Sequence, residues 1–175
     1  MNAKILFYSG LVITLVTSTK TLASDSNIVS VQAGRPAEHE RLSIVTTDIK
    51  FHHMFWQWGD SGCQFGLGGR GGMLKVGGES TARLGGGARM ECRWNNWTGW
   101  IPADVMWLDQ HQFGQRGNGF KDYGGPVQFA FGIGIGYSIS RNWLIGYQFE
   151  HMSNAYRYDK NPGLDSHNLH IEYRF

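Results

Sequence analysis

Residues 143–153 read WLIGYQFEHMS, and this stretch decides the fold because large apolar side chains alternate along it with smaller or polar ones. The apolar members share odd positions: Trp143, Ile145, Tyr147 and Phe149. Alternation with a period of two predicts a β-strand with one apolar face. His151 and Ser153 continue the same odd parity. We therefore expect a histidine and a serine on the apolar face of this strand.

The segment before this stretch alternates in the same way. Its large residues are Phe131, Ile133, Ile135, Tyr137 and Ile139, and glycine or serine occupies the positions between them. Such a small face suits the inside of a narrow barrel, where large side chains from other strands need room. Residues 140–142 form a tight turn, which predicts that the two segments pair as a hairpin.

The last eight residues, NLHIEYRF, form another amphipathic strand, with Leu169, Ile171, Tyr173 and Phe175 on one face. A terminal strand that ends in phenylalanine resembles the assembly signal of outer-membrane barrels. Barrel closure also removes the unpaired edge that such a strand would leave in an open sheet.

Composition favours the same class of fold over a soluble periplasmic protein. The chain has 25 glycines, 7 tryptophans and 7 tyrosines, and only 17% of its residues are charged. We expect an all-β protein, an eight-stranded antiparallel transmembrane β-barrel whose filled interior argues against a pore. The expected strands are roughly 27–34, 41–56, 61–76, 80–93, 99–110, 127–139, 143–156 and 167–175, with the fifth interrupted at Pro102.

The N-terminal segment is expected to lie outside this fold. Residues 1–4 are a short basic start, residues 5–16 are mostly apolar, and Thr21-Leu22-Ala23 is a small-x-small cleavage site. An apolar core of about a dozen residues is short of the ~20 that a membrane helix needs. We therefore predict a signal peptide at 1–23 and an outer-membrane barrel at 24–175. The net charge of +2, without a basic run, gives no reason to expect a nucleic-acid partner.

Turn length predicts which way the strands run. A short turn at 140–142 belongs on the periplasmic side, together with both termini. The strand that starts at Trp143 then climbs to the outer rim near residues 151–156, and the loop 157–166 is extracellular. Any chemistry carried by His151 and Ser153 would take place at the outer leaflet, on the side that faces lipid.

Residues 149–165 read FEHMSNAYRYDKNPGLD, which contains the parts of a serine esterase: a base, a hydroxyl nucleophile, amide donors and an orienting acid. A histidine and a serine two positions apart often occur by chance as an exposed polar pair. Here, however, they share one face with Cα atoms about 6.5–7 Å apart, within reach of each other. A polar pair on a lipid-facing surface also has no structural reason to be there.

These residues resemble the lipid A 3-O-deacylase family of outer-membrane barrels, which carries an H-x-S-N-A strand followed by an N-x-G loop and an acidic residue. The resemblance covers Gly125 to Phe175 and fades before Gly99. It implies the following roles: His151 as general base, Ser153 as nucleophile, Asp165 as orienting acid, Asn161 at the oxyanion and Asn154 as a supporting residue.

The acid position departs from the commoner pattern of the family, which often has glutamate. Asp165 is one methylene shorter, so its loop must approach His151 more closely. Glu150 and Asp159 are less favoured substitutes, and Glu150 has even parity and should point into the barrel.

The resemblance implies hydrolysis of the 3-linked acyl ester of lipid A in the outer leaflet of the outer membrane, which releases a 3-hydroxy fatty acid. It implies lipid A or lipopolysaccharide as the substrate and no metal or organic cofactor. A calcium-dependent outer-membrane phospholipase and a non-catalytic structural barrel remain as alternatives. The sequence leaves the oligomeric state open, and a homodimer is one of the states it allows.

Other patterns carry less chemistry. His52 and His53 are neighbours on a strand and face opposite sides, so a metal pair is disfavoured. Cys63 and Cys92 form either a disulfide or two unpaired thiols, and the sequence does not choose between them. Four tryptophans are expected in an interfacial aromatic girdle: Trp94, Trp97, Trp100 and Trp107.

Overall fold

The computed structural model describes residues 26–115, 117 and 119–175, so the predicted signal peptide at 1–23 lies outside the described residues. The described chain folds into ten β-strands. Their bounds are β1 Asn27–Pro36, β2 Ile44–Gln57, β3 Cys63–Val76, β4 Glu79–Trp94, β5 Trp97–Leu108, β6 Gln112–Gly114, β7 Phe120–Asp122, β8 Val127–Ser138, β9 Trp143–Ser153 and β10 Leu164–Arg174. Among these residues no helix is long and apolar enough to cross a membrane.

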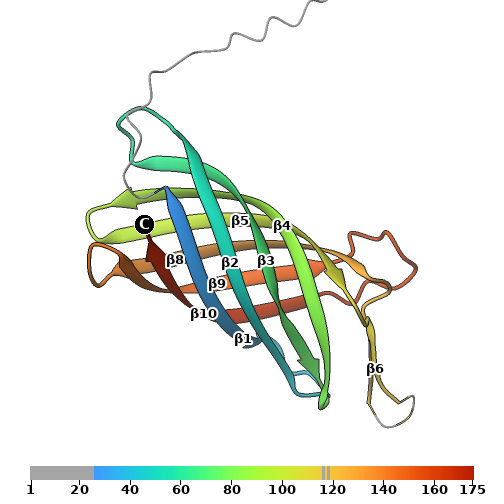
Figure 1. Ribbon diagram of the computed structural model, residues 1–175. Coiled ribbons are helices and arrows are strands. Elements are labelled where there is room, and N and C mark those ends of the chain that lie inside the picture. The colour runs from blue at the N-terminus through green and yellow to red at the C-terminus, as the bar shows by residue number, and fades with distance from the viewer. Residues whose placement is uncertain (1–25, 116, 118) are drawn as a thin grey trace, which may run out of the picture.

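Eight of the strands close into an antiparallel barrel in the order β1-β10-β9-β8-β5-β4-β3-β2 (Figure 1). The first and last strands pair directly, with Val31 opposite Ile171, so the ladder has no open edge. Strands β6 and β7 form a small separate ribbon within the connection between β5 and β8. The prediction of an eight-stranded antiparallel barrel is therefore confirmed.

The bounds of the eight barrel strands agree with the predicted ones to within three residues, and differences of three occur at the start of β2 and, beside the candidate site, at the end of β9 and the start of β10. β9 ends at Ser153 and β10 already begins at Leu164. The predicted interruption at Pro102 concerns one ladder only. β5 is continuous, but its pairing with β8 omits Ile101 and Pro102, since proline offers no N–H to that ladder.

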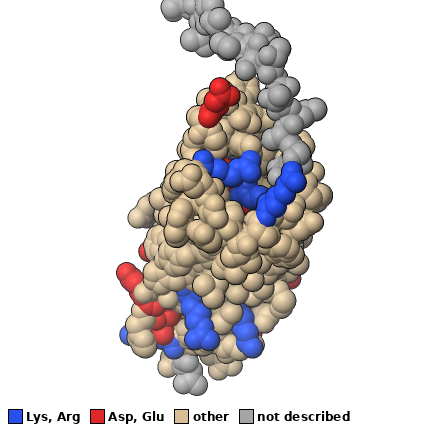
Figure 2. Space-filling view, turned by 90° about the vertical axis from the view of Figure 1, so that its left-hand side faces the viewer, with Lys and Arg blue, Asp and Glu red and all other residues tan. Residues whose placement is uncertain are grey.

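The outer surface is apolar around the middle of the barrel. Ile133, Ile145 and Leu169 are 61%, 48% and 73% exposed, an arrangement that suits lipid and not water. On the face drawn in Figure 2, charged side chains gather mainly toward the two ends, with an uncharged zone between them. Aromatic side chains mark the end that carries the termini: Trp94, Trp97, Tyr137, Trp143 and Tyr173.

Trp100 corrects one expectation, because it lies inside the barrel and not in the aromatic girdle. It is 2% exposed, and its Nε1 donates a hydrogen bond to Gln148 Oε1 at 2.8 Å. A Cβ added to Gly134 would meet the Trp100 ring at 2.1 Å. The glycine face of β8 therefore makes room for large side chains from other strands, as its small residues predict.

The interior is filled by ion pairs. Arg70 of β3 lies 2.6 Å from Asp48 of β2, 2.9 Å from Asp104 of β5 and 3.0 Å from Glu150 of β9. One guanidinium thus ties three other strands together across the barrel. Lys50 adds a second cation, 3.3 Å from Glu150. Buried charges of both signs pair with one another here, and Glu150 links β9 to β2 and β3 behind the candidate site.

An apolar cluster closes the end of the barrel opposite the termini. Its members come from six barrel strands and from the segment between β5 and β8: Ile44, Leu74, Val76, Met106, Leu108, Phe113, Tyr123, Ala130, Met152 and Leu164. The longest connections, 109–126 and 154–163, lie at this end, which marks it as extracellular. Met152 and Leu164 point inward here, so their neighbours in sequence point outward.

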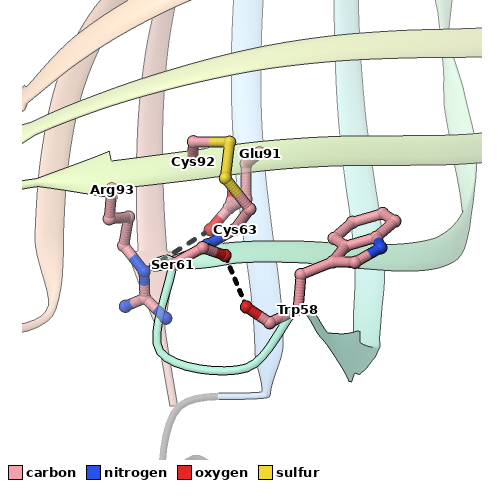
Figure 3. The surroundings of a disulfide bond; sticks show 6 residues. All are labelled: Trp58, Ser61, Cys63, Glu91, Cys92 and Arg93. Carbon is pink, nitrogen blue, oxygen red and sulfur yellow. Dashed lines mark hydrogen bonds and ion pairs between the residues drawn. A yellow bond between two sulfur atoms is a disulfide. The ribbon is translucent and has the colours of Figure 1, made fainter.

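The two cysteines form a disulfide at the other end of the barrel, which settles a question that the sequence leaves open (Figure 3). Cys63 starts β3 and pairs in register with Cys92 near the end of β4. The turn before Cys63 is closed by a hydrogen bond from Ser61 Oγ to the Trp58 carbonyl at 2.6 Å. The Arg93 N–H donates to the Gly62 carbonyl at 3.0 Å, so a hydrogen bond next to the disulfide also fastens the turn to β4.

Candidate active site

The candidate site lies at the extracellular rim, on the outside of the barrel, where β9 ends and β10 begins. The side chains of His151 and Asp165 are 51% and 39% exposed. Along β9 the odd positions are exposed or half-buried and the even ones are mostly buried, as the alternation predicts. His151 therefore shares the lipid-facing surface with Ile145 and Tyr147.

His151 and Asp165 form the central contact of the site. They are opposite one another in the β9–β10 ladder, and His151 Nδ1 lies 2.6 Å from Asp165 Oδ1. The expectation that Asp165 sits in a loop is wrong, because β10 begins one residue earlier. The strand register brings the carboxylate directly to the imidazole, so the shorter aspartate side chain is long enough.

The two substitute acids lie elsewhere. Glu150 is 2% exposed and faces the interior, where it pairs with Arg70 and Lys50. Asp159 is part of the 154–163 connection, and the carboxylate that contacts His151 is that of Asp165.

Ser153 is the last residue of β9 and lies beside His151 on the same face. Both line a hollow of about 270 Å³ in the outer surface, whose other walls come mainly from β5 and β8, including Val105, Phe129 and Phe131. The hollow is open to the lipid side and apolar on the walls facing Ser153. An apolar chain that lay in this hollow would lie next to the Ser153 hydroxyl.

The two asparagines are joined by a hydrogen bond. The Asn154 backbone N–H donates to Asn161 Oδ1 at 3.0 Å. This contact occupies the oxygen of the Asn161 amide, which leaves its NH₂ as the group that can donate to a ligand.

Asn154 itself is fully buried and holds loops together. Its Nδ2 donates to the carbonyls of Tyr123 at 2.9 Å and Lys160 at 2.5 Å. It therefore ties the end of β9 to both long extracellular connections. The chain turns sharply after it, since Ala155 and Tyr156 both have positive φ, 52° and 59°. Strained backbone of this kind clusters at functional sites.

Two interactions that hold the loops around the site could not be predicted from the sequence. Tyr123 contributes only a carbonyl, so its side chain gives no hint of the role. Lys160 Nζ lies 2.8 Å from Asp122 Oδ2, which fastens the 154–163 connection to β7. Partial burial works against ionisation of Asp122, but Lys160 and the Gly124 N–H lower the pKa of this carboxyl below its usual range.

The sequence shows Gly163 as part of the N-x-G pattern, and the backbone conformation of this residue explains why glycine is needed there. Its φ is +65°, and a Cβ there would lie 3.4 Å from His151 Cε1. Glycine lets the chain enter β10 close against the imidazole. In the described ranges no group of three or more His, Cys, Asp or Glu side chains is arranged to hold a metal ion.

The closed ladder and the apolar outer band define the chain as an outer-membrane β-barrel protein. Similar folds occur in solved structures. The outer-membrane enzyme PagL matches with a TM-score of 0.61 at 19% identity, over 85% of this chain and 99% of that one. Neisserial surface protein A matches with a TM-score of 0.57 at 9% identity, over 86% of this chain and 97% of that one. A de novo designed transmembrane β-barrel matches with a TM-score of 0.55 at 14% identity, over 85% and 94%.

The family model of lipid A 3-O-deacylase (PagL) matches residues 49–174, and the chain belongs to this family. The protein is thus a lipid A deacylase, an ester hydrolase of the outer membrane. None of the curated proteins matches the chain.

Proposed function

We propose that Ser153, His151 and Asp165 are the catalytic residues of this deacylase. The observation that carries the proposal is the 2.6 Å contact between His151 Nδ1 and Asp165 Oδ1, beside Ser153 on the lipid-facing surface. A carboxylate that accepts the Nδ1–H leaves Nε2 unprotonated, and Nε2 can then take the proton of the serine hydroxyl. Ser153 Oγ attacks the ester carbonyl, and the imidazolium returns its proton to the departing sugar oxygen. Water then hydrolyses the acyl-enzyme by the same route and releases a 3-hydroxy fatty acid.

Asn161 is proposed to stabilise the oxyanion of the tetrahedral intermediate. Its Oδ1 accepts the Asn154 N–H, so its Nδ2 is the donor that remains for the substrate. Asn154 acts as a positioning residue, because its buried side chain fixes the loop that carries Asn161.

The substrate is proposed to enter sideways from the outer leaflet. The hollow beside Ser153 opens on the outside of the barrel, and Phe129 and Phe131 give it an apolar wall. All the proposed groups belong to one chain, so the chemistry needs no second copy. We also propose that residues 1–23 are removed as a signal peptide and that 24–175 form the mature barrel.

Mass spectrometry of lipid A tests the nucleophile. Ser153→Ala is expected to fold and to leave the 3-linked acyl chain in place, since the variant lacks the attacking oxygen. Ser80→Ala, which changes an exposed serine at the start of β4 on the same rim, serves as the control and is expected to deacylate normally. Normal deacylation by folded Ser153→Ala would exclude Ser153 as the nucleophile. Loss of activity in both variants would indicate damage to the barrel and not a specific role for the Ser153 hydroxyl.

A further inference from the structure

Two polar residues that the proposed chemistry does not use lie on the lipid-facing surface beside Asp165. His167 follows Asp165 by two residues, so both side chains leave β10 on the same face. Arg35 of β1 is the register partner of His167, and side chains so paired have Cβ atoms about 5 Å apart. Both residues are exposed.

This pair marks the point where the apolar band ends. The next outward-facing pair toward the middle of the barrel is Ala33 with Leu169, and Val31 with Ile171 follows. Arg35 and His167 therefore sit at the depth where lipid headgroups meet hydrocarbon, immediately next to the candidate site.

The His167 ring is held in a fixed orientation. Its Nδ1 is hydrogen-bonded to the Tyr147 hydroxyl, and its ring centroid lies 5.8 Å from that of Phe149. The contact with Tyr147 occupies one ring nitrogen and leaves Nε2 as the nitrogen available to a ligand.

The charge of Arg35 is not compensated within the described chain. Two lysines of the same rim are paired with carboxylates, Lys121 with Glu40 at 2.6 Å and Lys160 with Asp122 at 2.8 Å. In residues 26–115, 117 and 119–175, no ion pair joins Arg35 to an acidic side chain. An unpaired guanidinium at headgroup depth attracts an anionic lipid group.

We propose that Arg35 and His167 form a subsite that binds a phosphate group of the lipid substrate. Lipid A is an acylated and phosphorylated glucosamine disaccharide, so ester and phosphate belong to one headgroup. The planar guanidinium fork can bind two phosphate oxygens, and His167 Nε2–H can donate to a third. A phosphate held there would orient the sugar with its ester toward Ser153, so this inference rests on the proposed function.

The anion belongs on the strand surface and not in the small hollow next to it. That hollow, of about 80 Å³, is lined by Glu38 and Glu40 together with His151 and Asp165. Glu40 is already paired with Lys121, but the carboxylates of Glu38 and Asp165 would repel a phosphate, which favours the outer face of β1 and β10 for the subsite.

The test compares lipid A with the same lipid A after enzymatic removal of its phosphates, in neutral detergent micelles. Arg35→Gln is expected to lower kcat/KM for phosphorylated lipid A about tenfold, mainly through KM, and to leave the dephosphorylated substrate unaffected. Lys75→Gln is the matched control, because Lys75 is an exposed cation on the same rim at β3, two strands from β1. It is expected to change neither rate.

Equal loss on both substrates would overturn the proposal, since Arg35 would then act on Asp165 or on the barrel. No loss on either substrate would also overturn it. In a third outcome, Arg35→Gln lowers the deacylation rate on dephosphorylated lipid A, but only when phosphatidylglycerol is added to the micelles. The site would then hold the phosphate of a neighbouring lipid, which contradicts its assignment to the substrate.

Binding measurements separate this inference from the proposed chemistry. In the Ser153→Ala background, binding of both lipid A forms is measured with and without Arg35→Gln. A phosphate preference that disappears with Arg35→Gln supports the subsite whatever the catalytic residues are. Equal binding of both forms, with Arg35 present, would reject the subsite even if Ser153 is the nucleophile.

Discussion

At the scale of single residues, the site depends on one cross-strand pair. Asp165 meets His151 because the two are opposite in an antiparallel ladder, so the strand register sets the distance between them. A base held by a strand partner loses less orientation than one held by a loop residue. For activity, the presence of a carboxylate at position 165 should therefore matter more than the length of the side chain that carries it.

Asp165→Ala is expected to reduce kcat by about 10²–10⁴, because an unsupported imidazole loses its tautomer and its orientation. Asp165→Glu should retain substantial activity, since the side chain is 39% exposed and a longer one has room to bend. Steady-state deacylation of purified lipid A measures both. Asp159→Ala is the control in the neighbouring connection, and damage by that variant instead would contradict the assignment of Asp165.

Alanine substitutions of Asn161 and Asn154 should impair the protein in different ways. Asn161→Ala removes the proposed oxyanion donor and is expected to lower kcat by about 10²–10³, and it also removes the acceptor of the Asn154 N–H, which should cost about 1 kcal/mol of stability. Asn154→Ala leaves the Tyr123 and Lys160 carbonyls without their donor, which should destabilise the loops by about 1–3 kcal/mol. Limited proteolysis of 154–163 distinguishes them, because cleavage is expected to be faster in Asn154→Ala than in Asn161→Ala. The same cleavage rate in both variants would show that Asn154 is not the anchor.

At the scale of elements, β9 carries its lipid-facing residues and the candidate site residues on the same face. Its lower odd residues contact lipid, and its upper ones, His151 and Ser153, belong to the candidate site. A shift of the register by one residue would turn both inward, where a lipid ester cannot reach them.

A charge in the middle of the lipid-facing surface should be costly. Ile133→Lys on β8 is expected to reduce the unfolding free energy by about 2–4 kcal/mol, because Ile133 lies in the middle of the outer apolar surface, opposite Phe149 of β9. Ile139→Lys is the matched control at the end of the barrel, just after β8, and should cost about 0–1 kcal/mol. Urea unfolding in lipid vesicles gives both values. Equal costs would show that Ile133 does not face the hydrocarbon.

The elements were predictable to the extent that alternation defines them. A period of two gave the strands, their faces and the closed barrel, because lipid outside and packing inside impose opposite demands on adjacent residues. It could not place the start of β10, where Leu164 and Asp165 follow Gly163 with no change of pattern. Nor could it place Trp100, whose inward position depends on Gly134 and Gln148 of other strands.

At the scale of the whole molecule, the disulfide and the site occupy opposite ends of the barrel. Cys63 and Cys92 join the periplasmic ends of β3 and β4, and the candidate site lies at the outer rim of β9 and β10. Removal of the disulfide should therefore lower the stability of the barrel and leave its catalytic rate unchanged.

Replacing both cysteines by alanine is expected to lower the unfolding free energy by about 2–4 kcal/mol, the usual effect of a crosslink that closes a loop of this size. The deacylation rate of the folded variant should not change. Urea unfolding and lipid A assays on one preparation measure both quantities. A lower deacylation rate in the fully folded double variant would mean that the periplasmic end is coupled to the site.

The ion-paired interior also decides what the protein does to the barrier in which it sits. Arg70 joins Asp48, Asp104 and Glu150 across the middle, so charged groups fill the space that water and ions would need. An inserted copy should therefore add no path for ions across the bilayer. A planar bilayer that contains the barrel is expected to show no conductance steps, and steps would mean that the interior is open.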